Sequence, residues 1–599
     1  MLIEEHYLNL KNYYMNQMIG ETFNVKLDEI SDALACTRRN ANFLLSRMVE
    51  KQWIEWTPGK GRGHSSQLVF LQAPESLILE IAKRKVLQNN LKGAHEFLDS
   101  ITCENSVLSS FSSWLHAQMG FQVEDYKLHS IERLRFPFYR PILNLDPAFS
   151  TRRTESHIVT QIFDTLVCYN SKTHSIESHL CHHWFTNEEQ TVWTFHLRKG
   201  LFFHDGKPLT SLDVKYTIER IQNPRTNSPH RWMTEDICKV TTPHERIIQI
   251  NLVKPNSIFD HYLSRTTFSI VPKHIPNFSP EMPLGSGPFF VKQNDSSRLV
   301  LAANESYFKE RATLDVIEIW VIPNYNGIET MSFEQLMPLS TSGLEENSSF
   351  SEIKNVEIGA NYIVFNMNKS GPQHSKDFRT ALQYVLNRRQ MIAELGGLRE
   401  TPAFSFIPGQ GIATMACDHQ LKLAQEYLVR SGYKGEKLLL FTYEMKINED
   451  NAKWIRKRAS EIGINIEVVV HSAPDLGKME VMLQADLITA GEVFDLPVDL
   501  GLIDMFQRGN SFVGGCLDSR LKDIKQSFIE KTLSMSDSED RLNTLLELEA
   551  VLLAERVLLP LFHSRQSVYH HDSLKGVTLN QLGWMNYRDL WIDYGVGED

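Results

Sequence analysis

The feature that most constrains the first 75 residues is a tight turn between two predicted helices, followed directly by a predicted β-hairpin. Leu27–Leu34 repeats apolar residues at helical spacing, and after a two-residue turn Thr37 is a suitable N-cap for a helix over Arg38–Lys51. Residues 53–56 and the start of 67–71 alternate apolar and polar side chains, as strands do. Helix, turn, helix and hairpin in this order predict an α/β winged helix-turn-helix.

Two expectations about the helices of this unit can be checked against a structure. A further helix is predicted upstream, over His6–Met18, with Leu8, Leu10, Tyr14 and Met18 among polar residues. The helix that begins at Arg38 should turn one apolar face inward, formed by Ala41, Leu44, Leu45 and Met48.

The predicted hairpin ends in a basic, glycine-rich loop, GKGRGHSS, at residues 59–66. A P-loop requires Ser or Thr directly after its lysine, but Lys60 is followed by Gly61. A dinucleotide-binding fingerprint requires glycine at the position that His64 holds. The glycines alternate with Lys60, Arg62 and His64, so these three side chains share one face. The loop is therefore predicted to be the basic tip of a wing.

Positive charge is concentrated in this unit, although the chain has a net charge of −11. Residues 37–64 contain six Lys or Arg and two Glu, which gives the segment a charge of +4. Arginine and asparagine are side chains that hydrogen-bond guanine and adenine in the major groove. Double-stranded DNA is the predicted partner, and a solvated charged helix face is the alternative. The candidate DNA-contacting residues are Thr37, Arg38, Arg39, Asn42, Arg47, Lys60 and Arg62.

Length and composition indicate a multidomain globular protein. At 599 residues the chain is too long for one core, and about three to five domains are expected. The first residues, MLIEEHYLNL, carry acid where a signal peptide carries lysine or arginine, and no long apolar run follows. The seven cysteines include no CxxC pair, which favours reduced thiols. These features predict a soluble, cytoplasmic protein that does not enter a membrane.

Three domains are predicted along the chain. Residues 1–75 form the winged helix-turn-helix, residues 76–125 form a helical linker, and residues 126–599 form a large α/β body. The linker can serve as a rigid connector, a dimer contact or a packing layer, and its periodicity does not separate these roles. In the body, 193–197 alternates as a half-buried strand. Thr210 with Asp213 then predicts a capping box at the start of a helix over 211–221.

The stretch WTFHLRKGLFFHDGKPLTSLDVKYTIERI at 193–221 resembles the signature region of the family 5 extracellular solute-binding proteins. Further matches follow in that family's order, among them PLGSGPFFVKQ at 283–293, NYIVFNMNKSG at 361–371 and DFRTALQYVLNRRQMI at 377–392. The basic N-terminal unit, with ACTRRNANFLLSRM at 35–48 and RRTESHIVTQIF at 152–163, is similar to the SgrR family of bacterial transcriptional regulators.

The resemblance implies a specific architecture and function. It implies a body of two lobes, of the class II periplasmic-binding-protein type, that binds a small molecule in the cleft between them. It also implies a cytoplasmic regulator that binds promoter DNA and uses this body to sense a solute, such as a sugar phosphate or a peptide-like molecule. No cofactor and no catalytic activity are implied. A homodimer is a further expectation, because winged helices often read two half-sites.

Residues that contact the ligand are harder to identify. In the family's peptide binders an aspartate near a Gly-Trp pair holds the peptide's amino group. The segment ADLITAGEVFDLPVD at 485–499 places Asp495 on that aspartate, and Glu492 replaces the tryptophan. The alternative is that Asp495 only caps a loop. A phosphorylated ligand would instead need arginines, and the candidates are Arg152, Arg153, Arg379, Arg388 and Arg389.

Other functions are weaker interpretations of the sequence. The histidines of SHLCHH at 178–183, and the pair His570 and His571, invite a metal site, but neighbouring histidines do not easily share one tetrahedral ion. No metal is therefore expected. No HExxH or GxSxG motif supports an enzyme. A substrate-binding component of an ABC importer is the main alternative, and the basic winged helix counts against it.

Overall fold

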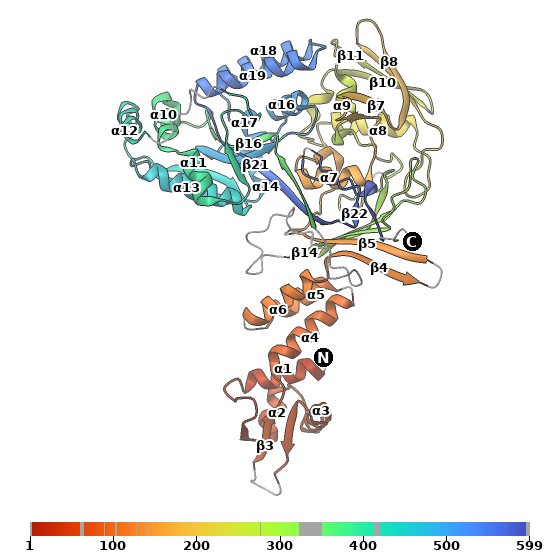
Figure 1. Cartoon of the computed structure of the whole chain (residues 1–599), viewed down its shortest axis with the longest axis vertical. Helices are drawn as coiled ribbons and strands as arrows, with labels where there is room; N and C mark the ends of the chain where they lie inside the picture. The colour runs from red at the N-terminus through yellow and green to blue at the C-terminus, as the bar shows by residue number, and fades with distance from the viewer. Residues whose placement is uncertain are drawn as a thin grey trace, which may run out of the picture. The chain divides into compact units, whose positions relative to one another are not determined.

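The computed structural model describes residues 3–59, 65–88, 90–101, 105–126, 129–138, 140–275, 277–322, 350–411, 420–580 and 582–594. The chain forms two compact units, of which the first contains Met1–Met119 and the second contains most of the chain from Gly120 onwards (Figure 1). None of the helices that the structure describes combines the length and the apolar character needed to cross a lipid bilayer.

The first unit begins as a winged helix-turn-helix. Its elements are α1 (Ile3–Tyr13), β1 (Thr22–Val25), α2 (Leu27–Ala33), α3 (Arg38–Glu50), β2 (Ile54–Thr57) and β3 (Ser66–Phe70). The strands form one antiparallel sheet in the order β1-β3-β2. The α2–α3 turn passes through Ala35, whose φ of 48° lies in the left-handed region. The four predicted inward residues of α3, Ala41, Leu44, Leu45 and Met48, are all buried, so that prediction is confirmed.

Two details of this unit differ from the sequence prediction. The helix α1 ends at Tyr13 rather than at Met18, and the Met18 side chain is 71% exposed. The apolar residues at 14–19 do not continue the buried face of α1, because the chain turns away at Gly20, where φ is 80°. Strand β1 was not predicted, since its four residues bury only one side chain fully, that of Val25.

Three helices complete the first unit: α4 (Pro74–Leu87), α5 (Leu91–Asp99) and α6 (Asn105–His116). Helix α4 contacts α1, α5 and α6, and it buries Leu77, Ile78, Ile81, Ala82 and Val86. An ion pair between Arg84 of α4 and Glu4 of α1, at 3.3 Å, joins it to the winged helix. These helices therefore pack on the winged helix as a layer, and the domain limits drawn from the sequence stay a prediction.

The second unit is a two-lobed α/β body. We call lobe I the part that contains the five-stranded and the four-stranded sheet and lobe II the part that contains the largest sheet. The first sheet of lobe I has the order β12-β13-β14-β5-β4, and the second has the order β10-β11-β9-β8. The bounds in lobe I are β4 (Gly120–Tyr126), β5 (His129–Phe138), α7 (Arg153–Ile162), β8 (Cys181–Thr186), β9 (Val192–Leu197), α8 (Ser211–Gln222), β10 (Ile237–His244), β11 (Ile247–Leu252), β12 (Phe289–Asn294), β13 (Arg298–Ala303) and β14 (Val316–Val321).

Two sequence predictions about lobe I are confirmed. Strand β9 covers the alternating segment at Val192–Leu197. Helix α8 begins with a capping box in which Thr210 and Asp213 each satisfy the backbone of the other. The backbone N–H of Thr210 donates to the Asp213 carboxylate at 2.8 Å. The capped helix then packs against strands β10 and β11 of the second sheet.

Lobe II is built on a mixed sheet, in which β15, β21, β16, β20, β18 and β19 follow one another and β17 also pairs with β21. The bounds are β15 (Phe350–Val356), β16 (Gly359–Phe365), β17 (Arg399–Pro402), β18 (Leu438–Tyr443), β19 (Ile466–His471), β20 (Leu487–Val493) and β21 (Leu558–His571). The helices around it are α10 (Lys376–Val385), α11 (Arg388–Leu395), α12 (Leu421–Arg430), α13 (Lys446–Ser460), α14 (Ala473–Leu476), α15 (Met479–Met482), α16 (Val498–Gln507), α17 (Phe512–Cys516), α18 (Ser519–Leu533) and α19 (Ser538–Ala554).

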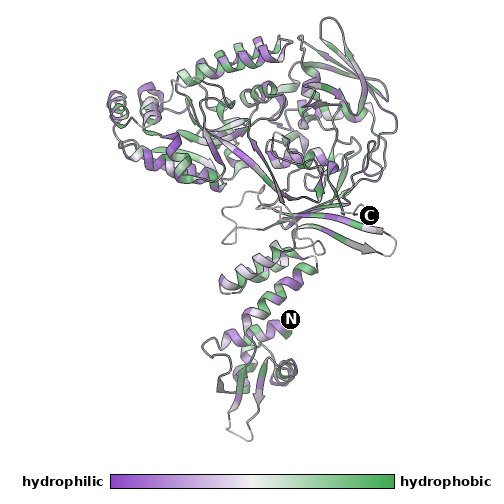
Figure 2. Ribbon diagram, in the orientation of Figure 1, coloured by the Kyte–Doolittle hydropathy of each residue, from purple (hydrophilic) through white to green (hydrophobic). Residues whose placement is uncertain are grey.

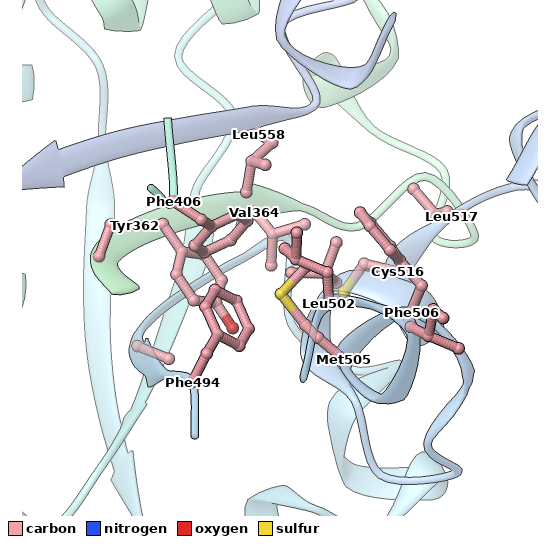
Figure 3. Packing of buried hydrophobic residues seen from close by; sticks show 14 of the residues in the cluster. Tyr362, Val364, Phe406, Phe494, Leu502, Met505, Phe506, Cys516, Leu517 and Leu558 are labelled. Atoms are coloured by element: carbon pink, nitrogen blue, oxygen red, sulfur yellow. The ribbon is translucent and has the colours of Figure 1, made fainter. Parts of the chain in front are cut away.

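Two apolar cores hold the body together. One lies in lobe I between α7, the first sheet and the C-terminal segment, where Trp584 and Tyr587 are buried. The other extends from the second sheet of lobe I through lobe II. Figure 3 shows part of the latter, with the rings of Tyr362, Phe406 and Phe494 gathered at one end. Figure 2 shows hydrophobic residues alternating with hydrophilic ones on the outer helices, as expected where one face is buried.

Candidate DNA interface and interlobe site

The exposed face of α3 carries most of the predicted DNA-contacting residues. Thr37 caps the helix, and its side chain accepts a hydrogen bond from the backbone N–H of Asn40 at 3.4 Å. The four other predicted residues of this region, Arg38, Arg39, Asn42 and Arg47, are all exposed. The helix therefore presents a polar, positively charged surface opposite its apolar core face.

The arginines of α3 differ in their surroundings. The Arg38 guanidinium forms a forked ion pair with both carboxylate oxygens of Asp28 in α2. Both side chains are exposed, and a surface ion pair of this kind contributes about 0–1 kcal/mol. Asp28 occupies the Nε and Nη2 donors of Arg38, so these two donors are available to a base only after the pair opens. Arg39 forms no ion pair with any residue that the structure describes, so it is the better candidate for reading guanine.

The wing of this unit is formed by β2 and β3. Thr57 pairs with Gln67 at the end of the hairpin, and the Gly59 N–H donates to the Ser66 hydroxyl at 3.1 Å. The predicted contact residues Lys60 and Arg62 lie outside the described residues.

One residue of the α3 surface was missed by the sequence analysis. Phe43 is 58% exposed, although the apolar residues on the other side of the same helix are buried. Its position could have been found from the helical period, since it lies opposite Ala41, Leu44, Leu45 and Met48.

Glu492 lies in an ion-pair network at the boundary between the two lobes. Both of its carboxylate oxygens accept hydrogen bonds from Arg508, at 3.2 Å. Arg508 also donates to Asp504, one turn earlier on α16, at 3.1 Å. Asp504 lies 3.2 Å from the His230 imidazole and accepts a hydrogen bond from the Trp232 indole, also at 3.2 Å. His230 and Trp232 belong to lobe I, so this network joins the lobes.

Electrostatics stabilise the charged forms in this network. Burial opposes the ionisation of Asp504, but His230 and Arg508 overcome it and hold the pKa of this carboxyl below its usual range. Burial likewise opposes the charge on Arg508, while Glu492 and Asp504 raise its pKa. One guanidinium therefore pairs with two carboxylates away from bulk water, and the His230 imidazole lies beside one of them.

Asp495 lies on the loop after β20. It is close to this network in sequence, but it takes no part in the hydrogen bonds given above. Its carboxylate accepts a hydrogen bond from the backbone N–H of Leu496 at 2.9 Å. Burial raises the pKa of Asp495, although Arg265 of lobe I acts in the opposite direction. Partial removal of a carboxyl from water disfavours its charged form, and this raises its pKa.

Two tyrosines lie on the same side of the lobe II sheet. Ala360 pairs with Glu492, and Tyr362 pairs with Ala490, so Tyr362 and Glu492 are diagonal neighbours on one face. The Tyr362 side chain is fully buried, and its hydroxyl has no hydrogen-bond partner within the described chain. A buried hydroxyl without a partner costs about 1–3 kcal/mol. Tyr443 ends strand β18, which is parallel to β20, and burial raises its pKa.

The start of α7 brings lobe I toward these tyrosines. Arg152 is the N-cap residue of α7 and has a favourable electrostatic interaction with ionised Tyr443, as has Arg153. Arg153 forms an ion pair with Glu357 of lobe II. Thr151 lies 3.5 Å from the side chain of Asn510. Side chains of both lobes therefore meet beside the carboxyl ends of β18 and β20, where ligands of α/β sheets commonly bind.

The remaining arginine candidates lie elsewhere. Arg379 donates to the backbone carbonyls of Gln373 and Glu555, at 2.6 and 2.7 Å. Arg388 donates to the carbonyl of Pro560 at 2.8 Å. Both arginines are buried, whereas Arg389 is exposed. Arg379 and Arg388 hold backbone segments together, and the structure does not bring them to the interlobe site.

Of the two histidine pairs, the structure describes both side chains only for His182 and His183. His182 and His183 are exposed on β8, with the ring of His196 about 6 Å from each. Among the described residues, no group of three or more His, Cys, Asp or Glu side chains has an arrangement that could hold a metal ion.

Two family models match the two parts of the chain. The N-terminal model of the sugar transport-related sRNA regulators matches residues 3–121. The model of the bacterial extracellular solute-binding proteins, family 5, matches residues 175–512. The regulator SgrR of Yersinia enterocolitica is 26% identical over 94% of this chain and 95% of its own length. This chain belongs to the SgrR family of transcriptional regulators.

Other relatives extend the same assignment. The SgrR regulator of Photorhabdus laumondii is 26% identical over 96% of each chain. The Bacillus subtilis protein YhjP is 30% identical over 99% of this chain and 100% of its own length. These matches confirm the resemblance drawn from the sequence and establish a transcriptional regulator with a solute-binding-like domain.

Solved structures confirm the fold of the body. The periplasmic binding protein DppA of Helicobacter pylori, in complex with the peptide STSA, has a TM-score of 0.64 and 20% identity, and the match covers 77% of this chain and 98% of that one. NikA of Brucella suis, in complex with Fe(III)-EDTA, has a TM-score of 0.63 and 17% identity, covering 77% of this chain and 100% of that one. The predicted two-lobed fold is therefore confirmed.

Proposed function

We propose that this SgrR-family protein is a cytoplasmic regulator that senses a small molecule between lobes I and II and changes its affinity for promoter DNA in response. The observation that carries the proposal is the fusion of two parts in one chain. A winged helix with an exposed, basic α3 precedes a body with the fold of solute-binding proteins. The body is proposed to bind its ligand rather than to convert it.

The interlobe contacts supply the element that a ligand can bias. His230 and Trp232 of lobe I hold Asp504 of lobe II, and the Gly509 N–H donates to the Pro229 carbonyl at 2.9 Å. Closure of two lobes around a ligand is a common conformational change in this fold. A ligand that favours one arrangement of the lobes can shift DNA affinity by about 1–3 kcal/mol, and DNA must then shift ligand affinity by the same factor.

Ligand chemistry follows from the charges at the site. Arg508 pairs with both Glu492 and Asp504. Each of these two acids therefore already has a cationic partner within the protein. The Tyr362 hydroxyl, which has no partner in the described chain, and Arg152, whose charge acts on Tyr443, suit a ligand with hydroxyl and anionic groups, such as a sugar phosphate. Asp495 is the one carboxyl of this region with a raised pKa and no recorded ion pair among the described residues, and it suits the amino group of a peptide-like solute.

The proposal is tested by measuring ligand and DNA binding on the full-length chain. Candidate sugar phosphates and short peptides are first screened by thermal shift. DNA affinity is then measured by fluorescence anisotropy on a duplex selected from a random pool, with and without each stabilising solute. We expect at least one solute to stabilise the protein and to change DNA affinity by about 5-fold to 150-fold.

Tyr362→Phe provides a sharp control, because it removes only the unpaired hydroxyl and leaves the packed ring in place. This variant should fold at least as stably as the wild type, bind DNA equally well without solute, and bind the solute more weakly. Equal DNA affinity with and without every stabilising solute would contradict the sensing function.

A substrate-binding component of an ABC importer remains the second candidate, because the solved neighbours of the body include an ABC transporter-associated binding protein. The SgrR-type N-terminal domain disfavours it. Cell fractionation separates the two, since an importer component is exported and the proposed regulator remains with the DNA.

A further inference from the structure

The centre of the exposed α3 surface is apolar. Phe43 lies four residues after Arg39 and four residues before Arg47, so the three side chains project from one face of the helix. The buried residues of α3 lie on the opposite face. Phe43 therefore points directly away from the protein core, between two cations.

An exposed phenylalanine alone is not informative, because single apolar residues are common on protein surfaces. The neighbours of Phe43 make the difference. Arg39, Asn42 and Arg47 are suited to phosphates and to guanine and adenine edges. These side chains surround Phe43 on the helix that a winged helix-turn-helix inserts into the major groove. Any surface that fits this face must offer negative charge around a small apolar feature.

Duplex DNA offers such a feature in one place. The 5-methyl group of thymine is an apolar group in the major groove, and phenylalanine is one of the side chains that contact it. Phosphates flank the groove on both sides. Arg39 and Arg47 are about 12 Å apart along the helix axis, at 1.5 Å per residue, which corresponds to between three and four base-pair steps. Phe43 projects from the middle of that span.

We infer that Phe43 is a specificity-determining residue that reads the 5-methyl group of one or two thymines in the operator. This inference rests on the proposed DNA-binding function and deepens it. Burial of one methyl group against the ring corresponds to about 0.8 kcal/mol, which is about a four-fold change in affinity. Arg39 and Arg47 then position the helix and supply the remaining contacts.

The experiment replaces thymine by deoxyuridine, which keeps the base pair and removes only the methyl group. A preferred duplex is selected from a random pool with the full-length protein, and each thymine of the duplex is substituted in turn. Wild-type protein should lose about four-fold in affinity at one or two positions. Phe43→Ala should bind the thymine duplex at least four-fold more weakly than the wild type and lose the discrimination at those positions.

Val49→Ala is the matched control, because Val49 is an exposed apolar residue of the same helix that lies off the central face. This variant should keep the discrimination between thymine and deoxyuridine. Folding is not the limiting step in the test, since alanine favours helix more than phenylalanine does. Circular dichroism verifies that Phe43→Ala retains the wild-type fold.

Several results would overturn the inference. Wild-type protein that binds all deoxyuridine duplexes as tightly as the parent duplex refutes it, as does discrimination that survives in Phe43→Ala. A changed oligomeric state in Phe43→Ala, with unchanged DNA discrimination, assigns the residue to contact with a second copy instead. Failure of the wild type to select any duplex overturns the DNA-binding function itself, which distinguishes that failure from the failure of the Phe43 inference alone.

Discussion

Acid should destabilise lobe I through one buried histidine, His157 of α7. Its imidazole stacks on Trp584, with ring centroids 4.8 Å apart and planes 12° apart, and meets the edge of Tyr587 at 4.8 Å. The side chain is 3% exposed, and its Nε2 atom has no hydrogen-bond partner in the described part of the chain. Burial without a compensating carboxylate lowers the pKa of His157 from 6.5 to about 3.

The size of the effect follows from linkage. The unfolded chain binds a proton near pH 6.5 and the folded chain does so only near pH 3, so the stability of the fold falls as pH falls through this range. The loss from this group is about 2 kcal/mol at pH 5 relative to pH 7.5. It is about 4 kcal/mol at pH 3 and approaches about 5 kcal/mol below that pH, at 1.36 kcal/mol for each unit of pKa difference.

The assay is urea unfolding of the full-length chain at pH 7.5 and pH 5, followed by tryptophan fluorescence. His157→Phe keeps an aromatic ring between Trp584 and Tyr587 and cannot be protonated. The difference in unfolding free energy between the two pH values should be about 2 kcal/mol smaller in this variant than in the wild type. Any packing cost of the larger ring cancels, because it is present at both pH values.

His183→Phe, at an exposed position of β8, should keep the wild-type pH dependence. If His157→Phe also shows the wild-type dependence, the imidazole is not buried in its neutral form. The proposed packing of the C-terminal segment on α7 would then be wrong.

Four further predictions concern the winged helix and the interlobe network. Thr37→Ala removes the cap of α3 and should lower the stability of the first unit by about 1 kcal/mol in urea unfolding. In anisotropy titrations, Lys60→Ala should weaken binding to all duplexes and reduce the slope of log affinity against log salt by about 1. Arg39→Ala should reduce the magnitude of the binding free energy by about 1–3 kcal/mol for the preferred duplex only. Arg508→Met should destabilise the body by about 3–5 kcal/mol in urea unfolding, because it leaves the Glu492 carboxylate without its cationic partner. Adding Glu492→Gln should restore part of that loss.

Local sequence patterns predicted the elements whose stability is local. The inward face of α3 and the capping box of α8 follow from the helical period and from side chains that cap the nearby backbone. Strand β9 followed from strict alternation. The two-lobed body was accessible only through resemblance, since no local pattern specifies the order of strands in a mixed sheet.

The interlobe network could not be predicted because its members are distant in the sequence. His230 meets Asp504 across 274 positions, and Arg153 meets Glu357 across 204. In the sequence, Glu492 only replaces the stacking tryptophan of the peptide binders. Its ion pair with Arg508 depends on how α16 lies beside β20 in the fold. Strand β1 was missed for a related reason, because four residues gain their stability from pairing with β3 rather than from their own pattern.

In the proposed function, a ligand signal has to pass from the body to the winged helix within one chain. Residues 37–64 carry a charge of +4, so the rest of the chain carries −15, given −11 overall. One or two ligand charges change that total little, and charges beyond about 8 Å are screened at physiological salt. Long-range attraction is therefore a poor signal.

The chain offers a mechanical route instead, since only residues 117–119 separate the end of α6 from the start of β4 in the first sheet of lobe I. In the proposed mechanism, a movement of lobe I against lobe II is transmitted to the winged helix through residues 117–119. A connection of three residues is too short to absorb such a movement.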